Sequence, residues 1–177
     1  TAVAPAWSEQ WIVYQPPGWY TIHCSDQAGA TAVPFVVVID RGRKPLPEKG
    51  RVCADAASAW LIRDEARRKT FARMIRLAGI PWVRERLSWP DTEPARGRID
   101  WAHYQNVADT LNAEGIRICQ VFHQTPDWAR GSSPDERPTD LRDLYSYLKT
   151  AAAHFRKQIA AWEIWNEIDI HFWSGLG

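Results

Sequence analysis

The pattern of apolar and polar residues changes near residue 50 and divides the chain into two parts. Residues 1–50 contain short aromatic and β-branched runs separated by turns, which is typical of β-strands. The runs 19–24 and 33–40 flank a polar turn, so the pattern predicts a hairpin. Residues 41–50 combine glycine, proline and charge, which is the composition of a linker. We therefore expect 1–50 to hold the last piece of a small β-sandwich-like domain and a linker.

From residue 51 the apolar residues fall alternately at strand and helix spacing. The predicted strands are 51–62 (ending in a loop), 80–87, 116–122 and 159–165, and the predicted helices are 64–78, 100–115 and 139–155. The predicted apolar faces are Phe71, Met74, Ile75 and Ala78 in the first helix, Tyr104, Val107, Ala108 and Leu111 in the second, and Leu141, Leu144, Tyr145, Leu148, Ala152 and Phe155 in the third. Buried strands that alternate with helices predict a parallel sheet.

The residues at the strand ends decide between an open sheet and a barrel. A dinucleotide-binding sheet requires a glycine-rich turn after its first strand, and this sequence has none. Polar and aromatic residues follow the strands instead, as in (β/α)8 barrels. Because a whole barrel needs about 250 residues, the predicted fold class of 51–177 is α/β, a partial (β/α)8 TIM barrel of about four βα units. The chain starts at Thr1 and stops at Gly177, and we expect it to be a fragment of a longer protein.

Four motifs in this second part occur in an order that points to one group of enzymes. Residues 162–167 read Trp-Glu-Ile-Trp-Asn-Glu and place an amide and a carboxyl at the rim of the predicted barrel. This strand end resembles the clan A glycoside hydrolases, whose fourth strand ends in Asn-Glu. The segments 79–84, 89–101 and 115–128 are similar to the second strand, its following loop and the third strand of that clan. The motifs are similar to both family 39 β-xylosidases and family 5 cellulases, and they do not separate the two.

The resemblance implies a hydrolase that cleaves O-glycosyl bonds of poly- or oligosaccharides by a retaining mechanism. Glycoside cleavage uses one carboxyl that protonates the leaving oxygen and a second carboxylate across the sugar ring. Glu167 matches the general acid/base of the clan, whereas its nucleophile, a glutamate at the end of the seventh strand, lies outside this sequence. The implied or candidate substrate-binding residues are Asn166, Arg84, His123, Trp128 and Trp173.

Each of these residues also has a structural interpretation. Arg84 is also suited to an ion pair inside the barrel, with Glu85 or Glu163 as its partner. His123 and the two tryptophans are suited to backbone bonding and loop packing, and residues 93–94 to shaping a turn. Strand alternation places Arg84 and Arg86 on one face of their strand, so we expect Arg84 and His123 to face the same rim as Glu167.

Composition narrows the function further. A net charge of +1 gives no overall bias toward nucleic acid, and no run of 18 apolar residues is present to span a membrane. Three dispersed cysteines have neither the density of a disulfide framework nor the spacing of a zinc site. We predict no metal and no cofactor. The 11 tryptophans suit sugar stacking. The expected partner is a carbohydrate, in a secreted or periplasmic protein of undetermined oligomeric state.

Two other functions compete with the hydrolase. The first is a non-catalytic carbohydrate-binding barrel that has lost its nucleophile, which the residue at the end of the seventh strand would reveal. The second is a metal-dependent barrel hydrolase, which is disfavoured because no histidines and carboxylates occur at metal-ligand spacing.

Overall fold

The computed structural model describes residues 15–37, 45–131 and 137–167. The chain divides into two compact units, Thr1–Asp40 and Arg41–Gly177. The predicted linker 41–50 therefore groups with the second unit. Its Leu46 packs against the core of that unit, and the Pro47 carbonyl accepts a hydrogen bond from Arg117.

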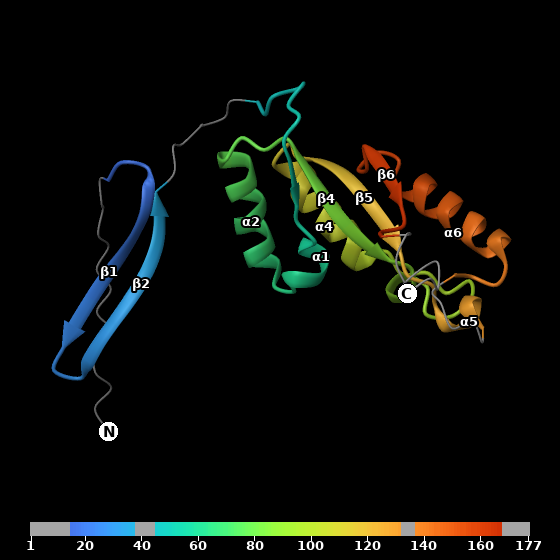
Figure 1. Cartoon of the computed structure of the whole chain (residues 1–177), viewed down its shortest axis with the longest axis horizontal. Helices are drawn as coiled ribbons and strands as arrows, with labels where there is room; N and C mark the ends of the chain where they lie inside the picture. Colours follow the sequence, from blue (N-terminus) through green and yellow to red (C-terminus); the bar gives the residue numbers. More distant parts are fainter. Residues whose placement is uncertain (1–14, 38–44, 132–136, 168–177) are drawn as a thin grey trace. The chain divides into compact units, whose positions relative to one another are not determined.

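The first unit contains the predicted hairpin. Strands β1 (Gly18–Asp26) and β2 (Gly29–Val37) pair antiparallel, with Gly18 opposite Val37 (Figure 1). The rings of Tyr20 and Phe35 stack across the strands at 5.5 Å. Trp19 remains 73% exposed, and apolar side chains of both strands are open to solvent. A two-stranded hairpin is marginally stable by itself, so this unit carries apolar surface that its own two strands do not cover.

The second unit is built on four parallel strands. They are β3 (Cys53–Asp55), β4 (Trp82–Ser88), β5 (Arg117–His123) and β6 (Ala161–Ile164), and they lie in the sheet in the order of the sequence. Three long helices connect them, namely α2 (Glu65–Leu77), α4 (Ala102–Ala113) and α6 (Leu141–His154). One-turn helices follow the first three strands, at α1 (Ser58–Leu61), α3 (Trp89–Thr92) and α5 (Asp127–Arg130).

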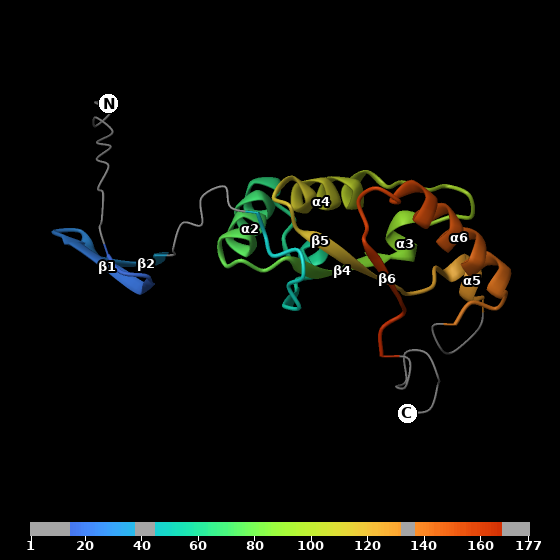
Figure 2. The same ribbon diagram turned by 90° about the horizontal axis from the view of Figure 1, so that it is seen from above.

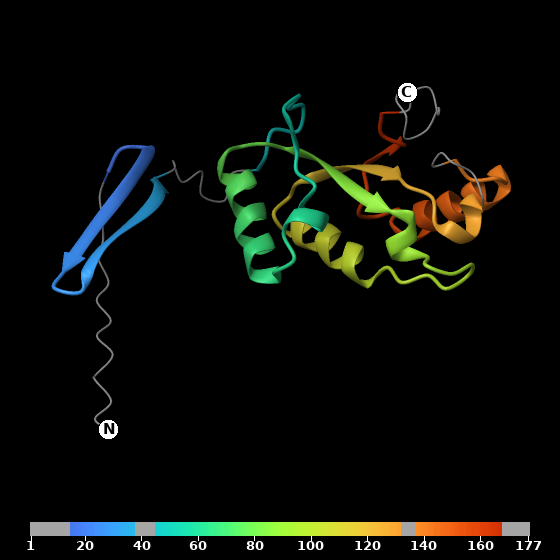
Figure 3. The same ribbon diagram turned by 60° about the horizontal axis from the view of Figure 1, so that its bottom comes forward.

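The long helices all cover one face of this sheet (Figures 2 and 3). Sequential strand order with helices on one side is the arrangement that closes into a barrel, since an open doubly wound sheet reverses its order and covers both faces. The structure thus confirms the predicted fold class, a partial (β/α)8 barrel represented by its first four strands. Among the described residues, no helix is long and apolar enough to cross a membrane.

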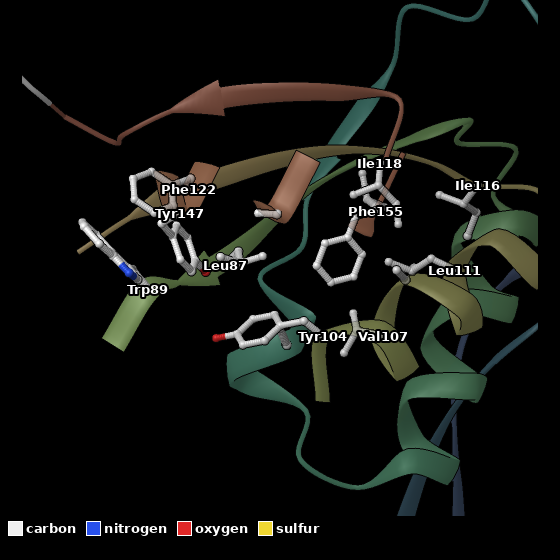
Figure 4. Close-up of a cluster of buried hydrophobic side chains, with 14 of the residues drawn as sticks. Leu87, Trp89, Tyr104, Val107, Leu111, Ile116, Ile118, Phe122, Tyr147 and Phe155 are labelled. Carbon is white, nitrogen blue, oxygen red and sulfur yellow. The ribbon is translucent and has the colours of Figure 1, made fainter. Parts of the chain in front are cut away.

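The core lies between the sheet and these helices (Figure 4). Helix α4 buries the four residues predicted for its apolar face, and Asp100 accepts a hydrogen bond from its first N–H, that of Ala102, at 2.8 Å. The rings of Trp89, Phe122 and Tyr147 gather at one end of the core in Figure 4. The other end is filled by Phe155 and by aliphatic side chains, Val107, Leu111, Ile116 and Ile118.

The predicted face of helix α2 needs correction. Its start is as expected, because the Asp64 carboxylate accepts a hydrogen bond from the backbone N–H of Arg67. However, Met74 is 53% exposed, Ala78 is exposed as well, and Arg68 is buried instead. The Arg68 guanidinium is tolerated there because it donates to backbone carbonyls and to Asn106 Oδ1, each at 2.8 Å. Hydrogen bonds supplied by other segments therefore override the apolar pattern.

The predicted face of helix α6 is also partly wrong. Leu141 and Tyr145 are 64% and 66% exposed, and Ala152 is exposed as well. Tyr147, absent from the predicted face, is only 2% exposed. Its ring stacks on Trp89 with centroids 5.0 Å apart, and its hydroxyl is 2.5 Å from Thr92 Oγ1. A partner for both the ring and the hydroxyl explains why the helix turns this tyrosine inward.

The two tyrosines of α6 provide a matched test of this packing. We expect Tyr147→Ala to lower the free energy of unfolding by about 3–5 kcal/mol, as for other buried aromatic residues. Tyr145→Ala should change it by no more than about 0.5 kcal/mol, because its ring is exposed. Urea unfolding followed by circular dichroism measures both values, and equal losses would contradict the observed orientation of α6.

Candidate functional site

Polar side chains gather on the face of the four-stranded sheet that the helices do not cover. In parallel strands, neighbours in register point to the same face, and Arg84 pairs with Asp55 on one side and with Cys119 on the other. His123 ends β5 in register with Ser88, two residues beyond Arg86. Arg84, Arg86 and His123 thus share the face of the sheet opposite the helices. The candidate site that we describe consists of Asp55, Arg84, Arg86, His123 and Glu163 on this face, and of Asn166 and Glu167, which follow β6 in the chain.

Arg84 connects three strands at the centre of this site. Its Nε and Nη2 donate to the two carboxylate oxygens of Glu163 on β6 at 2.7 and 2.5 Å. Nη2 also donates to Asn166 Oδ1, and Nη1 to Asp55 Oδ2 on β3, both at 2.9 Å. The pair with Glu163 has the two-pronged geometry that makes arginine–carboxylate contacts strong and directional. Of the two predicted ion-pair partners, Glu163 is therefore the correct one.

Asp55 binds a second arginine as well. Its carboxylate lies 2.7 Å from Arg86 Nη1 and accepts a hydrogen bond from Arg86 Nη2 at 2.9 Å. Hydrogen bonds from Arg86, and from Arg84 after it, hold the pKa of Asp55 below its usual value. The hydrogen bonds from Arg84 likewise lower the pKa of Glu163, and those to Glu163 raise the pKa of Arg84. The two carboxylates balance the two guanidinium charges on this face.

Sequence reasoning missed Asp55, although a usable signal was present. The residue is the last of strand β3, and a polar residue at a strand end is the signal that singled out Arg84, His123 and Asn166. The strand is only three residues long and no apolar run marks it. Its end was therefore not evident within the predicted segment 51–62.

Glu85 lies on the opposite face and has a structural role. It is 1% exposed, and its two carboxylate oxygens accept hydrogen bonds from the backbone N–H groups of Ser58 and Ala59 at 2.8 and 3.1 Å. These two N–H groups begin helix α1, where no helical partner exists for them. Because side chains alternate along a strand, Glu85 points to the start of helix α1 and its neighbour Arg84 points to the site.

His123 presents an unsatisfied nitrogen. Its ring lies 4.7 Å from the Trp60 ring of α1, and its Nε2 is buried with no hydrogen-bond partner among the described residues. Burial, with a further contribution from the positive charges of Arg86 and Arg84, lowers its pKa to about 4. The imidazole is therefore neutral near pH 7, and Nε2 is available to a ligand hydroxyl. Trp60 was not singled out from the sequence.

Trp128 packs within the loops. Its Nε1 donates to the Glu93 carbonyl at 2.9 Å, and the Arg96 guanidinium lies 4.5 Å above its ring. The rings of Trp128 and Trp89 meet in a T-shaped contact with centroids 5.5 Å apart. The buried Glu93 carboxylate accepts hydrogen bonds from Trp89 Nε1 and from the backbone N–H of Gly97, both at 2.7 Å. Glu93 therefore shapes the loop after β4. The predicted sugar contact of Trp173 lies outside the described residues.

Glu167 follows a strained turn at the end of β6. Trp165 and Glu167 have φ angles of 73° and 52°, a left-handed conformation that is uncommon for residues with a side chain. Trp165 is buried, its ring contacts Phe122 edge-on at 5.7 Å, and its N–H donates to the Phe122 carbonyl at 2.7 Å. Glu167 itself is exposed. Such strain requires support from surrounding structure and is concentrated at functional sites.

Nothing in the described part of the chain groups three or more His, Cys, Asp or Glu side chains in a way that could hold a metal ion. What this arrangement offers chemically is an exposed carboxyl, an amide held by an arginine, and a neutral imidazole with a free nitrogen.

Known proteins similar to this chain are glycoside hydrolases. The model of Glycosyl hydrolase family 10 matches residues 48–170. An endo-1,4-beta-xylanase from Agaricus bisporus is 27% identical over 85 residues, which are 46% of this chain and 25% of that protein. The beta-galactosidase BgaA from a Thermus species is 33% identical over 79 residues, 43% of this chain and 12% of that protein. The predicted resemblance to clan A glycoside hydrolases is thus confirmed.

Among solved structures, a family 39 glycoside hydrolase from the gut symbiont Bacteroides cellulosilyticus WH2 is 25% identical with a TM-score of 0.65. The match covers 85% of this chain and 32% of that one. It fits the similarity to family 39 noted in the motifs. The chain spans no more than about a third of the length of these relatives.

The unsatisfied imidazole predicts a pH dependence of stability. An unfolded histidine has a pKa of about 6.5, whereas the folded pKa of His123 is about 4. Between these values the unfolded chain binds a proton that the folded chain does not. The contribution of His123 is therefore fully present above about pH 6.5 and is lost as the pH falls toward about 4.

We expect His123→Asn to flatten the decrease in unfolding free energy between pH 7 and pH 5, as measured by urea titration. A His23→Asn variant of the exposed hairpin histidine serves as the control. NMR titration of the ring should show His123 uncharged at pH 5.5. A midpoint near 6.5 for that ring in the folded protein would contradict the prediction.

Proposed function

Because the chain belongs to glycosyl hydrolase family 10, we propose that it carries the acid/base half of the active site of a retaining O-glycosyl hydrolase. The observation that carries this proposal is the position of Glu167. Its exposed carboxyl stands at the end of the fourth strand, directly after an asparagine that Arg84 holds. The proposed substrates are poly- or oligosaccharides, in keeping with the endo-1,4-beta-xylanase among its relatives.

In the proposed mechanism, Glu167 protonates the glycosidic oxygen as the leaving group departs. It then removes a proton from the water that attacks the glycosyl-enzyme. The first step leaves Glu167 as a carboxylate, which is the form that accepts the proton of the attacking water, so the second step regenerates the acid. The nucleophile would lie on a part of the barrel outside this chain, across the sugar and about 5–5.5 Å from Glu167, as retaining enzymes require.

The neighbouring polar residues would bind the sugar. Asn166 would contact the 2-hydroxyl, a contact that strengthens in the transition state. The neutral His123 would bind another hydroxyl through its buried Nε2, since a buried nitrogen without a partner is costly until a ligand satisfies it. Arg84 would lie beside the nucleophile. Trp128 is a candidate for stacking on the sugar, although its ring also packs within the loops.

We further propose that the hairpin belongs to a β-rich domain that precedes the barrel. Apolar side chains exposed on both strands support this, because further strands would cover them. The likeness to the family 39 structure covers 85% of the chain, more than Arg41–Gly177 alone supplies.

The acid/base role of Glu167 can be tested in the longer protein that carries this chain. Glu167→Ala should slow natural glycosides by about 10²–10⁴-fold and substrates with an activated phenol far less, because a good leaving group needs no proton. Azide, which attacks without deprotonation, should restore turnover and give a glycosyl azide of retained configuration.

The exposed Glu65, paired with Lys69 on helix α2, provides the control, and Glu65→Ala should leave these rates unchanged. Equal losses on both substrate types without azide rescue would show that Glu167 is not the acid/base. If the unaltered longer protein binds sugar without cleaving it, the alternative of a carbohydrate-binding barrel is the correct one.

The proposal also predicts that residues 1–177 alone do not hydrolyse glycosides, because the carboxylate that forms the covalent intermediate is missing. Purified chain incubated with activated aryl glycosides should release no phenol above background. Turnover that disappears in Glu167→Ala would contradict this and place the nucleophile within the chain.

A further inference from the structure

The orientation of the Asn166 amide follows from its contact with Arg84. The guanidinium carries only donors, so the group that faces it at 2.9 Å must be the oxygen Oδ1. The Nδ2 group therefore points away from Arg84. Among the described residues, none accepts a hydrogen bond from Nδ2 or competes with a ligand for its two donors.

Asn166 needs such an anchor because regular strand geometry ends before it. Strand β6 ends at Ile164, and both Trp165 and Glu167 have left-handed backbone conformations. Strand alternation consequently does not dictate where the Asn166 side chain points. A free amide in this position could present either its oxygen or its nitrogen to a ligand, since the two ends have almost the same shape.

Arg84 can select one end only if it is itself held in place, and Glu163 contributes most to this. Glu163 binds Nε and Nη2 together, and Nη2 is the same nitrogen that contacts Asn166. Asp55 binds only the other terminal nitrogen, Nη1. That single contact does not prevent the guanidinium from pivoting and moving Nη2 away from Asn166. Glu163 precedes Asn166 by three residues. One short segment of the chain therefore carries both the carboxylate that holds Arg84 and the amide that Arg84 orients.

We propose that Glu163 is a positioning residue for recognition of the sugar 2-hydroxyl. It fixes Arg84 so that Arg84 takes the Asn166 oxygen, and the Nδ2 donors then face the 2-hydroxyl of the bound glycoside. Glu163 does not touch the substrate. This inference rests on the proposed hydrolase function and names a determinant of specificity within the same site.

The test compares an aryl glycoside with its 2-deoxy analogue in the longer protein. Glu163→Gln retains the shape of the side chain but replaces one acceptor oxygen with a donor, which breaks the paired contact with Arg84. We expect kcat/KM for the ordinary glycoside to fall about 10- to 100-fold, somewhat less than the loss of a whole oriented donor causes. The 2-deoxy analogue lacks the hydroxyl that the Asn166 amide would contact. Its kcat/KM should therefore fall by less than about threefold.

Two further variants make this result specific. Asn166→Ala should show the same selectivity for the 2-hydroxyl, and adding Glu163→Gln to it should cause little further loss, because both act on one contact. Glu114→Gln alters arginine–carboxylate pairs outside the site, those with Arg73 and Arg76, and should leave kcat/KM for both substrates unchanged. If Glu163→Gln does not fold, Glu163→Asp, which shortens the carboxylate, should show the same selectivity.

Equal losses on the two substrates would overturn the inference, because a general structural defect affects both. The outcome is separable from that of the proposed function. Should Glu167→Ala show the acid/base signature while Glu163→Gln acts equally on both substrates, only the positioning role fails. Should Glu167→Ala lack that signature, the proposed function itself fails.

Discussion

The contact of Arg84 with three acidic or amide side chains is the interaction on which this site depends. A guanidinium on the inner face of a barrel is costly unless its charge is neutralised and its donors are bound. Here Glu163 and Asp55 neutralise it from the strands β6 and β3, and Asn166 takes a further donor. The same contacts join the first, second and fourth strands at the edge where the chemistry is proposed to occur.

Strand β4 shows how one short segment serves both the core and the site. Val83 and Leu87 point into the helix-covered core, and Arg84 and Arg86 point to the other face. Glu85 lies on the core side and is tolerated because two backbone N–H groups at the start of α1 bind its carboxylate. A shift of one residue in this strand would bury the arginines and expose the core residues, so the core also fixes the orientation of the site.

Aromatic packing holds together the segments that follow β4 and β5. Trp89 lies at the centre, with its ring on Phe122 and Tyr147 and its Nε1 bound to the Glu93 carboxylate. Trp128 then closes on Trp89 from the next loop. These contacts tie the loop after β4 to the loop after β5 and to helix α6. They explain why several of the tryptophans that the composition assigned to sugar stacking are engaged within the protein.

The sequence by itself determined the order of strands and helices, the partial barrel and the clan. These features follow from local apolar periodicity, from helix caps such as Asp64, and from residues at fixed positions relative to strand ends. It also placed Arg84 and His123 on one face, because alternation along a strand is a local property. The partner of Arg84, by contrast, lies 79 residues away, and the choice of Glu163 over the adjacent Glu85 required the pairing of three strands.

Only the tertiary structure decided which faces of α2 and α6 are buried, the role of Asp55 and the unsatisfied nitrogen of His123. In each case the outcome depends on groups from distant segments. Asn106 accepts a hydrogen bond from the buried Arg68. Trp89 and Thr92 contact the ring and the hydroxyl of the buried Tyr147. Two arginines bind Asp55. Periodicity describes which side chains share a face, but hydrogen-bond partners far along the chain decide whether a polar side chain can be buried there.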